Sequence, residues 1–144
     1  MYLTIDANNL WKTYDQKIAP EGLYRGGGNS SSAKMYKDQN GQKSVRPADF
    51  KIIFDKTENA DMAYPDPTRG LSFSNSIGRL EDLSIVGKVW LLPRDAKLPE
   101  GLVINYRSID HPLVNVKDKM PLPKLIEKLQ QLEALMSNTG VTIR

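Results

Sequence analysis

Apolar residues recur at spacings of three and four near the end of the chain, in the most regular hydrophobic pattern of the sequence. This spacing places them on one face of an α-helix, so we predict an amphipathic helix over about residues 123–137. Pro121 and Pro123 suit its start, where backbone N–H groups have no partner within the helix. We assign the apolar face to the hydrophobic core and expect Gly140 to end the helix. The apolar positions are Leu122, Leu125, Ile126, Leu129, Leu132, Leu135 and Met136.

Shorter apolar runs, bounded by prolines and polar residues, predict strands along the rest of the chain. Residues 50–54 (FKIIF) are predicted to form a buried strand or a short helix, and residues 77–83 a helical turn. Residues 86–92 (VGKVWLL) are the best strand candidate. Further strands are expected at residues 102–104, 113–116 and 141–143. Together these patterns predict an α+β fold with about five to seven short strands and one firm helix.

Residues 71–74 (LSFS) alternate apolar and hydroxyl side chains. Because successive side chains of a strand point to opposite faces, Ser72 and Ser74 are predicted to share one face. The preceding residues 64–70 contain Pro65 and Pro67, which exclude regular structure there. We therefore expect an ordered loop that leads into a strand with two hydroxyl groups on the same side.

Three polar or weakly patterned stretches are expected to contribute little regular structure. The first twenty residues alternate weakly and could form a strand or a short helix. Residues 26–28 (GGG), followed by an Asn/Ser run, are predicted to be a flexible loop. The basic residues Lys34, Lys37, Lys43 and Arg46 lie in a Ser/Gln/Asn/Gly-rich stretch, which favours a solvated loop.

The amino-acid composition excludes several kinds of active site and metal site. The 144 residues suffice for one domain, residues 1–144, and 40% hydrophobic with 26% charged residues is typical of a folded protein. The absence of cysteine excludes disulfides, Cys-ligated zinc and a thiol nucleophile. His111 is the one histidine, which excludes histidine-rich metal sites, and we expect no bound metal.

Charge and hydropathy set expectations for partners. The net charge is +3, from 20 basic and 17 acidic residues, and the basic residues are scattered, so there is no strong nucleic-acid signal. The most apolar stretch, residues 85–92, is far shorter than the roughly 20 residues that span a bilayer. The first fifteen residues lack the pattern of a Sec signal peptide. We therefore expect no membrane association and synthesis in a cytoplasm.

A few polar residues could carry chemistry. Arg25 stands beside the triple glycine and could bind a phosphate or carboxylate, although a structural salt bridge is equally consistent with its surroundings. His111 follows Asp110 and precedes a proline, as expected of a surface turn in which it bonds to Asp110. A Ser-His-Asp triad from Ser72 or Ser74 is discounted, because no strand-turn-helix elbow surrounds either serine. Glu81, Asp82 and Asp110 are the nearby carboxylates.

The same residues mark a resemblance to a known family. Ordered blocks of the chain resemble the type VI secretion cytotoxin family with an ADP-ribosyltransferase-like fold. The blocks are residues 23–25 (LYR), 64–74 (YPDPTRGLSFS) with Gly78 and Leu80, 92–104 (LPRDAKLPEGLVI), and His111 through Met120 into the terminal helix. The resemblance implies a split, mostly antiparallel β-sheet with few helices and a C-terminal amphipathic helix.

The resemblance also implies a site. In such folds a split sheet opens onto a cleft that binds NAD, with an arginine of the first strand on the phosphate or ribose side. Arg25 occupies that place, and the hydroxyl-bearing strand at the nicotinamide end falls on Ser72. Ser74 is added because it shares the strand face of Ser72. His111 matches a family histidine that opens a strand, and Tyr64 begins the block that leads to the hydroxyl strand. The implied catalytic residues are Arg25, Ser72 and His111, and the implied NAD-binding residues are Arg25, Tyr64, Ser72 and Ser74.

The resemblance implies an NAD-dependent toxin of interbacterial competition. Such a toxin uses NAD as its substrate. The secretion apparatus delivers the toxin to the cytoplasm of the target cell, and a cognate immunity protein inhibits the toxin in the producing cell. Trp11 and Trp90 are candidate contacts for that partner. The acceptor stays open. No Glu or Asp matches the catalytic glutamate of classical transferases, so either another acid such as Asp110 substitutes or the chemistry is altered. The alternatives are an enzyme that modifies RNA or other nucleic acid in a phosphotransferase-like reaction, and a non-enzymatic protein-binding module.

Overall fold

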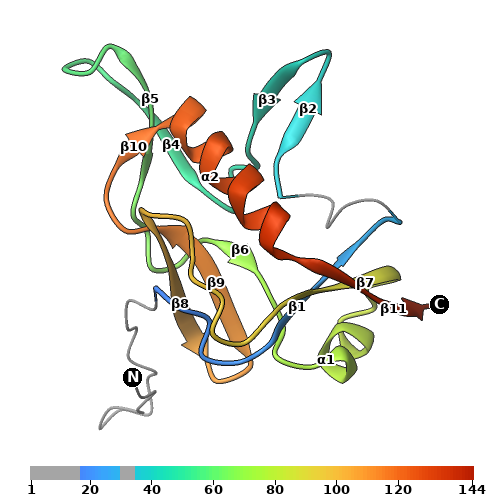
Figure 1. Cartoon of the computed structure of the whole chain (residues 1–144). Coiled ribbons are helices and arrows are strands. Elements are labelled where there is room, and N and C mark those ends of the chain that lie inside the picture. Colours follow the sequence, from blue (N-terminus) through green and yellow to red (C-terminus); the bar gives the residue numbers. More distant parts are fainter. Residues whose placement is uncertain (1–16, 30–34) are drawn as a thin grey trace, which may run out of the picture.

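The computed structural model of the chain describes residues 17–29 and 35–144 (Figure 1). Within these ranges the protein is mostly antiparallel β-structure, arranged as several small sheets with two helices, which confirms the α+β prediction. Neither helix is long and apolar enough to cross a membrane. Of the element expected in the first twenty residues, residues 1–16 lie outside the described residues, as do Trp11 and Lys34. In the remaining part, Ile18 forms an isolated β-bridge with Lys97.

Two three-stranded sheets supply most of the polar residues singled out in the sequence. In one, β7 (Gly87–Leu92) lies between β1 (Leu23–Gly27) and β11 (Ser137–Ile143). In the other, β9 (His111–Val116) lies between β6 (Leu71–Ser72) and β8 (Leu102–Ser108). The strands expected at residues 86–92, 102–104, 113–116 and 141–143 are thereby confirmed: β7 begins one residue later than expected, and the other three strands are longer than expected.

The two sheets meet at a single residue pair, Tyr24 and Ser74. Tyr24 N donates to Ser74 O at 2.7 Å, and Ser74 N donates to Tyr24 O at 2.9 Å. Beyond this pair β1 continues along β7, with Arg25 opposite Trp90, whereas β6 continues along β9. The two sheets therefore diverge directly after they touch.

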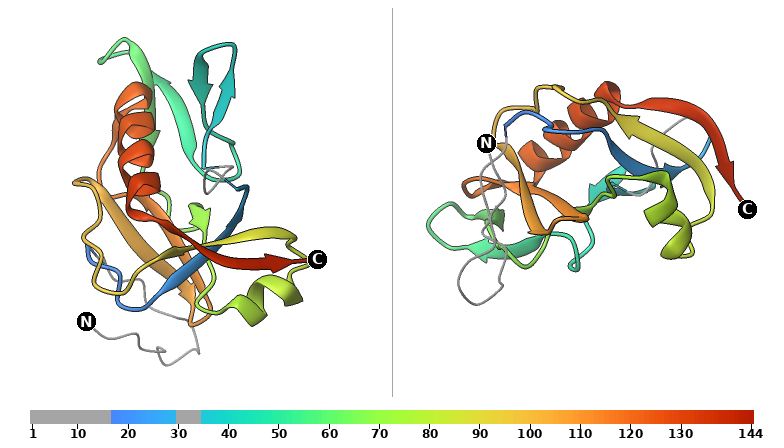
Figure 2. Two further views of the ribbon diagram at one scale, coloured as in Figure 1. Left: turned by 45° about the vertical axis from the view of Figure 1, so that its right-hand side comes forward. Right: turned by 90° about the horizontal axis from the view of Figure 1, so that it is seen from below.

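A third sheet and a hairpin lie at the other end of the molecule (Figures 1 and 2). The sheet has β5 (Ala60–Tyr64) between β10 (Met120–Pro121) and β4 (Lys51–Asp55). The hairpin consists of β2 (Lys37–Gln39) and β3 (Gln42–Ser44), where Lys43 Nζ lies 3.6 Å from Asp38. The solvated loop predicted for this basic stretch is thus an exposed two-stranded hairpin in its described part.

The C-terminal helix α2 (Leu122–Leu135) confirms the predicted amphipathic helix. Its inward face buries Leu125, Ile126, Leu129 and Leu132 in a core that also contains Phe50, Leu92 and Val114. The sequence predicted that Gly140 ends the helix, but the helix ends at Leu135. Met136 already has an extended backbone, and Gly140 lies within β11, where its φ of +83° falls at a shift of register between Asn138 and Thr142.

Three further predictions need correction. Residues 50–54 do include a strand, β4, but Ile53 and Phe54 are exposed, because β4 is the outer strand of its sheet. Gly26 and Gly27 belong to β1 rather than to a flexible loop. Trp90 is no surface contact: it is 9% exposed, and its Nε1 donates to Gly28 O at 2.8 Å.

Residues 65–70 form the ordered loop that the sequence predicted over residues 64–70, whereas Tyr64 is the last residue of β5. Asn115, fully buried on β9, donates from Nδ2 to Asp66 O at 3.2 Å and to Arg69 O at 2.8 Å. Gly70 closes the loop at φ +156°, where a Cβ atom would lie 2.8 Å from Leu113 Cβ. The loop therefore fixes where β6 begins, and β6 carries Ser72.

Candidate functional site

A cavity of about 670 Å³ opens where the two sheets diverge. Arg25 to Gly28 follow Tyr24 on one side, and Ser72 and Phe73 precede Ser74 on the other, so both segments leave the Tyr24–Ser74 pair in the same direction. The short helix α1 (Ile77–Asp82) and the residues after it form a further wall. The lining residues are Arg25, Gly26, Gly27, Gly28, Arg46, Ser72, Phe73, Ser74, Arg79, Leu80, Leu83, Ile85, Val86, Asp110 and His111.

The structure brings together four of the five residues that the sequence singled out. Arg25, Ser72, Ser74 and His111 all line this cavity, although 86 positions separate the first from the last. Strands of the two sheets that meet at the Tyr24–Ser74 pair supply these residues: β1 supplies Arg25, β6 supplies Ser72 and β9 begins with His111.

Arg25 is the buried cation of the cavity. It is 8% exposed, its Nη1 donates to Ser72 O at 2.7 Å, and its Cζ lies 5.7 Å from the centre of the Phe73 ring. Burial lowers the pKa of Arg25 to about 10, while Asp49 opposes that shift. The guanidinium thus stays protonated at neutral pH and carries a poorly solvated positive charge, which favours an anionic ligand.

Ser72 and His111 form the polar contact of the cavity. Ser72 Oγ lies 3.3 Å from His111 Nε2. The β6–β9 register explains the contact: Ser72 faces Leu113, and His111 stands two residues before Leu113 on the same face of β9. Burial lowers the pKa of His111, with Arg107 and Arg79 acting in the same direction and Asp110 against it. The imidazole is therefore neutral at pH 7.

Ser74 and Asp110 also line the cavity, but both have structural contacts. Ser74 is 2% exposed, and its backbone forms the joint between the sheets, so its first role is structural. Asp110 accepts a hydrogen bond from Ser108 Oγ at 2.9 Å and lies 3.5 Å from Arg79 Nε, so it faces these two groups. Asp110 is nevertheless the carboxylate that lines the cavity.

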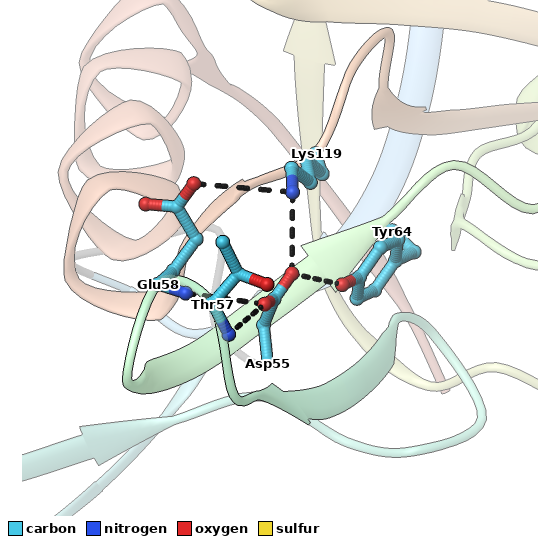
Figure 3. Close-up of polar contacts among 5 residues, drawn as sticks. All are labelled: Asp55, Thr57, Glu58, Tyr64 and Lys119. Carbon is cyan, nitrogen blue, oxygen red and sulfur yellow. Dashed lines mark hydrogen bonds and ion pairs between the residues drawn. The ribbon is translucent and has the colours of Figure 1, made fainter.

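Tyr64 lies away from the cavity, in a polar network on the β4–β5 hairpin (Figure 3). Its hydroxyl donates to Asp55 Oδ2 at 2.6 Å, and Lys119 Nζ reaches the same oxygen at 3.2 Å. The backbone N–H groups of Thr57 and Glu58 donate to Asp55 Oδ1 at 2.9 and 3.1 Å. These hydrogen bonds, the one from Tyr64 foremost, hold the pKa of Asp55 well below its usual range. The network ties the hairpin to the residue preceding β10.

Sequence reasoning missed two arginines of the cavity, Arg46 and Arg79. Arg46 was assigned to a solvated loop, but it lines the cavity while its Nε donates to Asp49 Oδ2 at 2.8 Å. Arg79 lies on α1, which Ser76 caps by accepting a hydrogen bond from Arg79 N. The signal available for Arg79 was its position between Gly78 and Leu80, which both fall in a block of the family resemblance.

The lining combines positive charge with an apolar wall. Among the residues that the structure describes, three arginines face the cavity against one carboxylate, Asp110, so this lining has a net positive charge while His111 is neutral. The apolar part consists of Phe73, Leu80, Leu83, Ile85 and Val86. A cavity of this kind suits a ligand that joins an anionic group to a flat apolar one.

No family model, no curated protein and no solved structure matches the chain.

Proposed function

We propose that the protein is an NAD-cleaving toxin and that the cavity between the two diverging sheets binds NAD. The observation that carries the proposal is the convergence of Arg25, Ser72 and His111, from three separate strands, on one cavity of net positive charge. These are the residues to which the family resemblance assigns the site. Their meeting in space was not required by any local sequence pattern.

The arrangement of the sheets supports an ADP-ribosyltransferase-like fold. That fold has a split β-sheet whose opening receives the dinucleotide. Here β1 touches the segment that follows β6, at Tyr24 and Ser74, and the cavity lies where β1 and β6 separate from this pair. The terminal helix α2 packs against the core outside the cavity.

Each part of the cavity has a role in this proposal. The charges of Arg25 and Arg79 bind the diphosphate. Phe73 and the apolar wall hold the nicotinamide, and the Ser72–His111 pair orients its amide. In the reaction the bond between nicotinamide and ribose breaks, the bonding electrons leave with nicotinamide, and water or an acceptor hydroxyl bonds to the ribose carbon. Asp110 takes the proton from that nucleophile and stabilises the developing positive charge on the sugar.

The family resemblance supports the biological setting. A type VI secretion apparatus would deliver the toxin to the cytoplasm of a target bacterium, and a cognate immunity protein would protect the producing cell. The net charge of only +3 gives little support to the nucleic-acid alternative, because tight binding to nucleic acid depends on many contacts between basic residues and phosphates.

Expression of the chain in a bacterial cytoplasm tests this proposal in vivo. We expect growth arrest within one or two generations, accompanied by a fall in cellular NAD, because the enzyme consumes a shared cofactor. NAD would be measured in extracts over time, with an Asp110→Asn variant as the matched control at equal expression. Growth arrest with the NAD concentration unchanged would indicate a toxin that acts on a substrate other than NAD. Normal growth with soluble protein would contradict the proposal.

A further inference from the structure

The outer strand β4 has one edge without a neighbouring strand in the described part of the chain. The sheet order β10-β5-β4 places β5 on one side of β4 and none on the other. The β4–β5 hairpin lies at the end of the molecule opposite α1 (Figures 1 and 2). An open edge presents backbone N–H and C=O groups that can pair with another strand.

The middle of this edge strand is apolar and exposed. Ile53 is 44% exposed and Phe54, next to it on the opposite face, is 55% exposed. Natural edge strands usually carry a charge, a proline or a bulge at their centre, which prevents edge-to-edge pairing. In β4 the charged residues, Lys51 and Asp55, stand only at the two ends.

The sequence of β4, KIIFD, is complementary to itself when it is reversed. We propose that β4 pairs antiparallel with β4 of a second copy of this chain, with the twofold axis at Ile53. Lys51 then faces Asp55 of the partner subunit, Ile52 faces Phe54 of the partner subunit, and the two Ile53 side chains face each other. Both charge pairs are of opposite sign, and every apolar residue meets an apolar residue.

Neighbouring registers lack this match. A shift of two residues in one direction places Ile53 opposite Asp55, and a shift in the other places Ile53 opposite Lys51. Both alternatives set a charge against an exposed apolar side chain. The sequence of β4 therefore favours the register centred on Ile53. Because the contact is small, we expect a weak dimer, with a Kd on the order of 10–100 µM.

This interface leaves the NAD cavity open. None of the β4 residues lines the cavity. The pairing therefore stands or falls independently of the proposed activity.

Cysteine crosslinking tests the register, because the chain contains no native cysteine. In the proposed dimer the two residues at position 53 are directly opposite, with Cβ atoms about 4.5–5.5 Å apart, close to the separation of a disulfide. We expect Ile53→Cys at about 100 µM to form a covalent dimer under mild oxidation. Ile109→Cys is the matched control: Ile109 is similarly exposed, at 57%, and lies outside the hairpin. Equal crosslinking of the two variants, or stronger crosslinking of Phe54→Cys than of Ile53→Cys, would overturn the proposal.

Sedimentation equilibrium tests the dimer without any crosslink. We expect the unmodified chain to dimerise reversibly, and Phe54→Lys and Lys51→Glu each to raise the Kd at least tenfold. The first introduces a charge opposite Ile52, and the second sets like charges opposite each other. Ile109→Lys should leave the Kd unchanged. Thermal melts would establish that all three variants fold. A chain that stays monomeric at about 1 mM, or a dimer that Phe54→Lys leaves intact, would refute the pairing.

Discussion

Arg25→Gln lowers kcat/KM for nicotinamide release from NAD by about 10²- to 10³-fold, the usual loss when one preorganised electrostatic contact is removed from an active site. Glutamine is uncharged and shorter than arginine, so this change removes the hydrogen bond from Nη1 to Ser72 O together with the buried positive charge, which our account places on the diphosphate. The measurement is the initial rate of nicotinamide release over a range of NAD concentrations, together with a thermal melt of each protein.

Arg94→Gln is the matched control for this variant. Arg94 is exposed and lies outside the cavity, so the same chemical change there should leave kcat/KM within about twofold of the original protein. Equal activity of Arg25→Gln and the original protein would remove Arg25 from the site. A variant that no longer folds would be replaced by Arg25→Lys, which keeps the charge but loses the planar guanidinium.

His111→Asn lowers kcat by about 10²-fold and also changes the pH profile. Because the pKa of His111 in the folded protein lies below its ordinary value of about 6.5, the ring is neutral at pH 7 and gains a proton only as the pH falls through the lowered pKa. If the neutral ring orients the amide of nicotinamide, activity is constant at neutral pH and declines on acidification as the ring gains its proton.

The measurement is log kcat against pH between about 4.5 and 8, in buffers of constant ionic strength. His111→Asn should lose the acid limb that belongs to the imidazole. Tyr64→Phe should keep the whole profile, because its hydroxyl is bonded to Asp55 outside the cavity. An activity that rises on acidification would show that the protonated ring is the working form and would contradict the role proposed here.

The comparison of sequence and structure shows which features local pattern can reveal. The helix α2 was predictable because Leu125, Leu129 and Leu132 repeat at helical spacing and the core needs that face. The exposure of Phe54 was not predictable, because an apolar run looks the same in an outer strand as in a central one. Strand order decides between the two, and it is a property of the whole fold.

The candidate site likewise depends on contacts between residues far apart in the sequence, which local pattern does not reveal. The hydrogen bond from Arg25 to Ser72 O spans 47 positions, and its existence depends on where β1 leaves Ser74. Only the family resemblance connected these residues before the fold was known. Arg46 shows the opposite case: its polar neighbours predict a solvated loop, yet the fold turns it towards the cavity.

Release of free nicotinamide from NAD by the purified protein is the most direct test of the central claim. Our account predicts stoichiometric loss of NAD and appearance of nicotinamide, at a rate that falls by about 10²- to 10³-fold when Arg25 is changed to glutamine. Calorimetric titration of NAD into the same samples would separate binding from cleavage. Unchanged NAD after prolonged incubation, together with no heat of binding at millimolar NAD, would contradict the account.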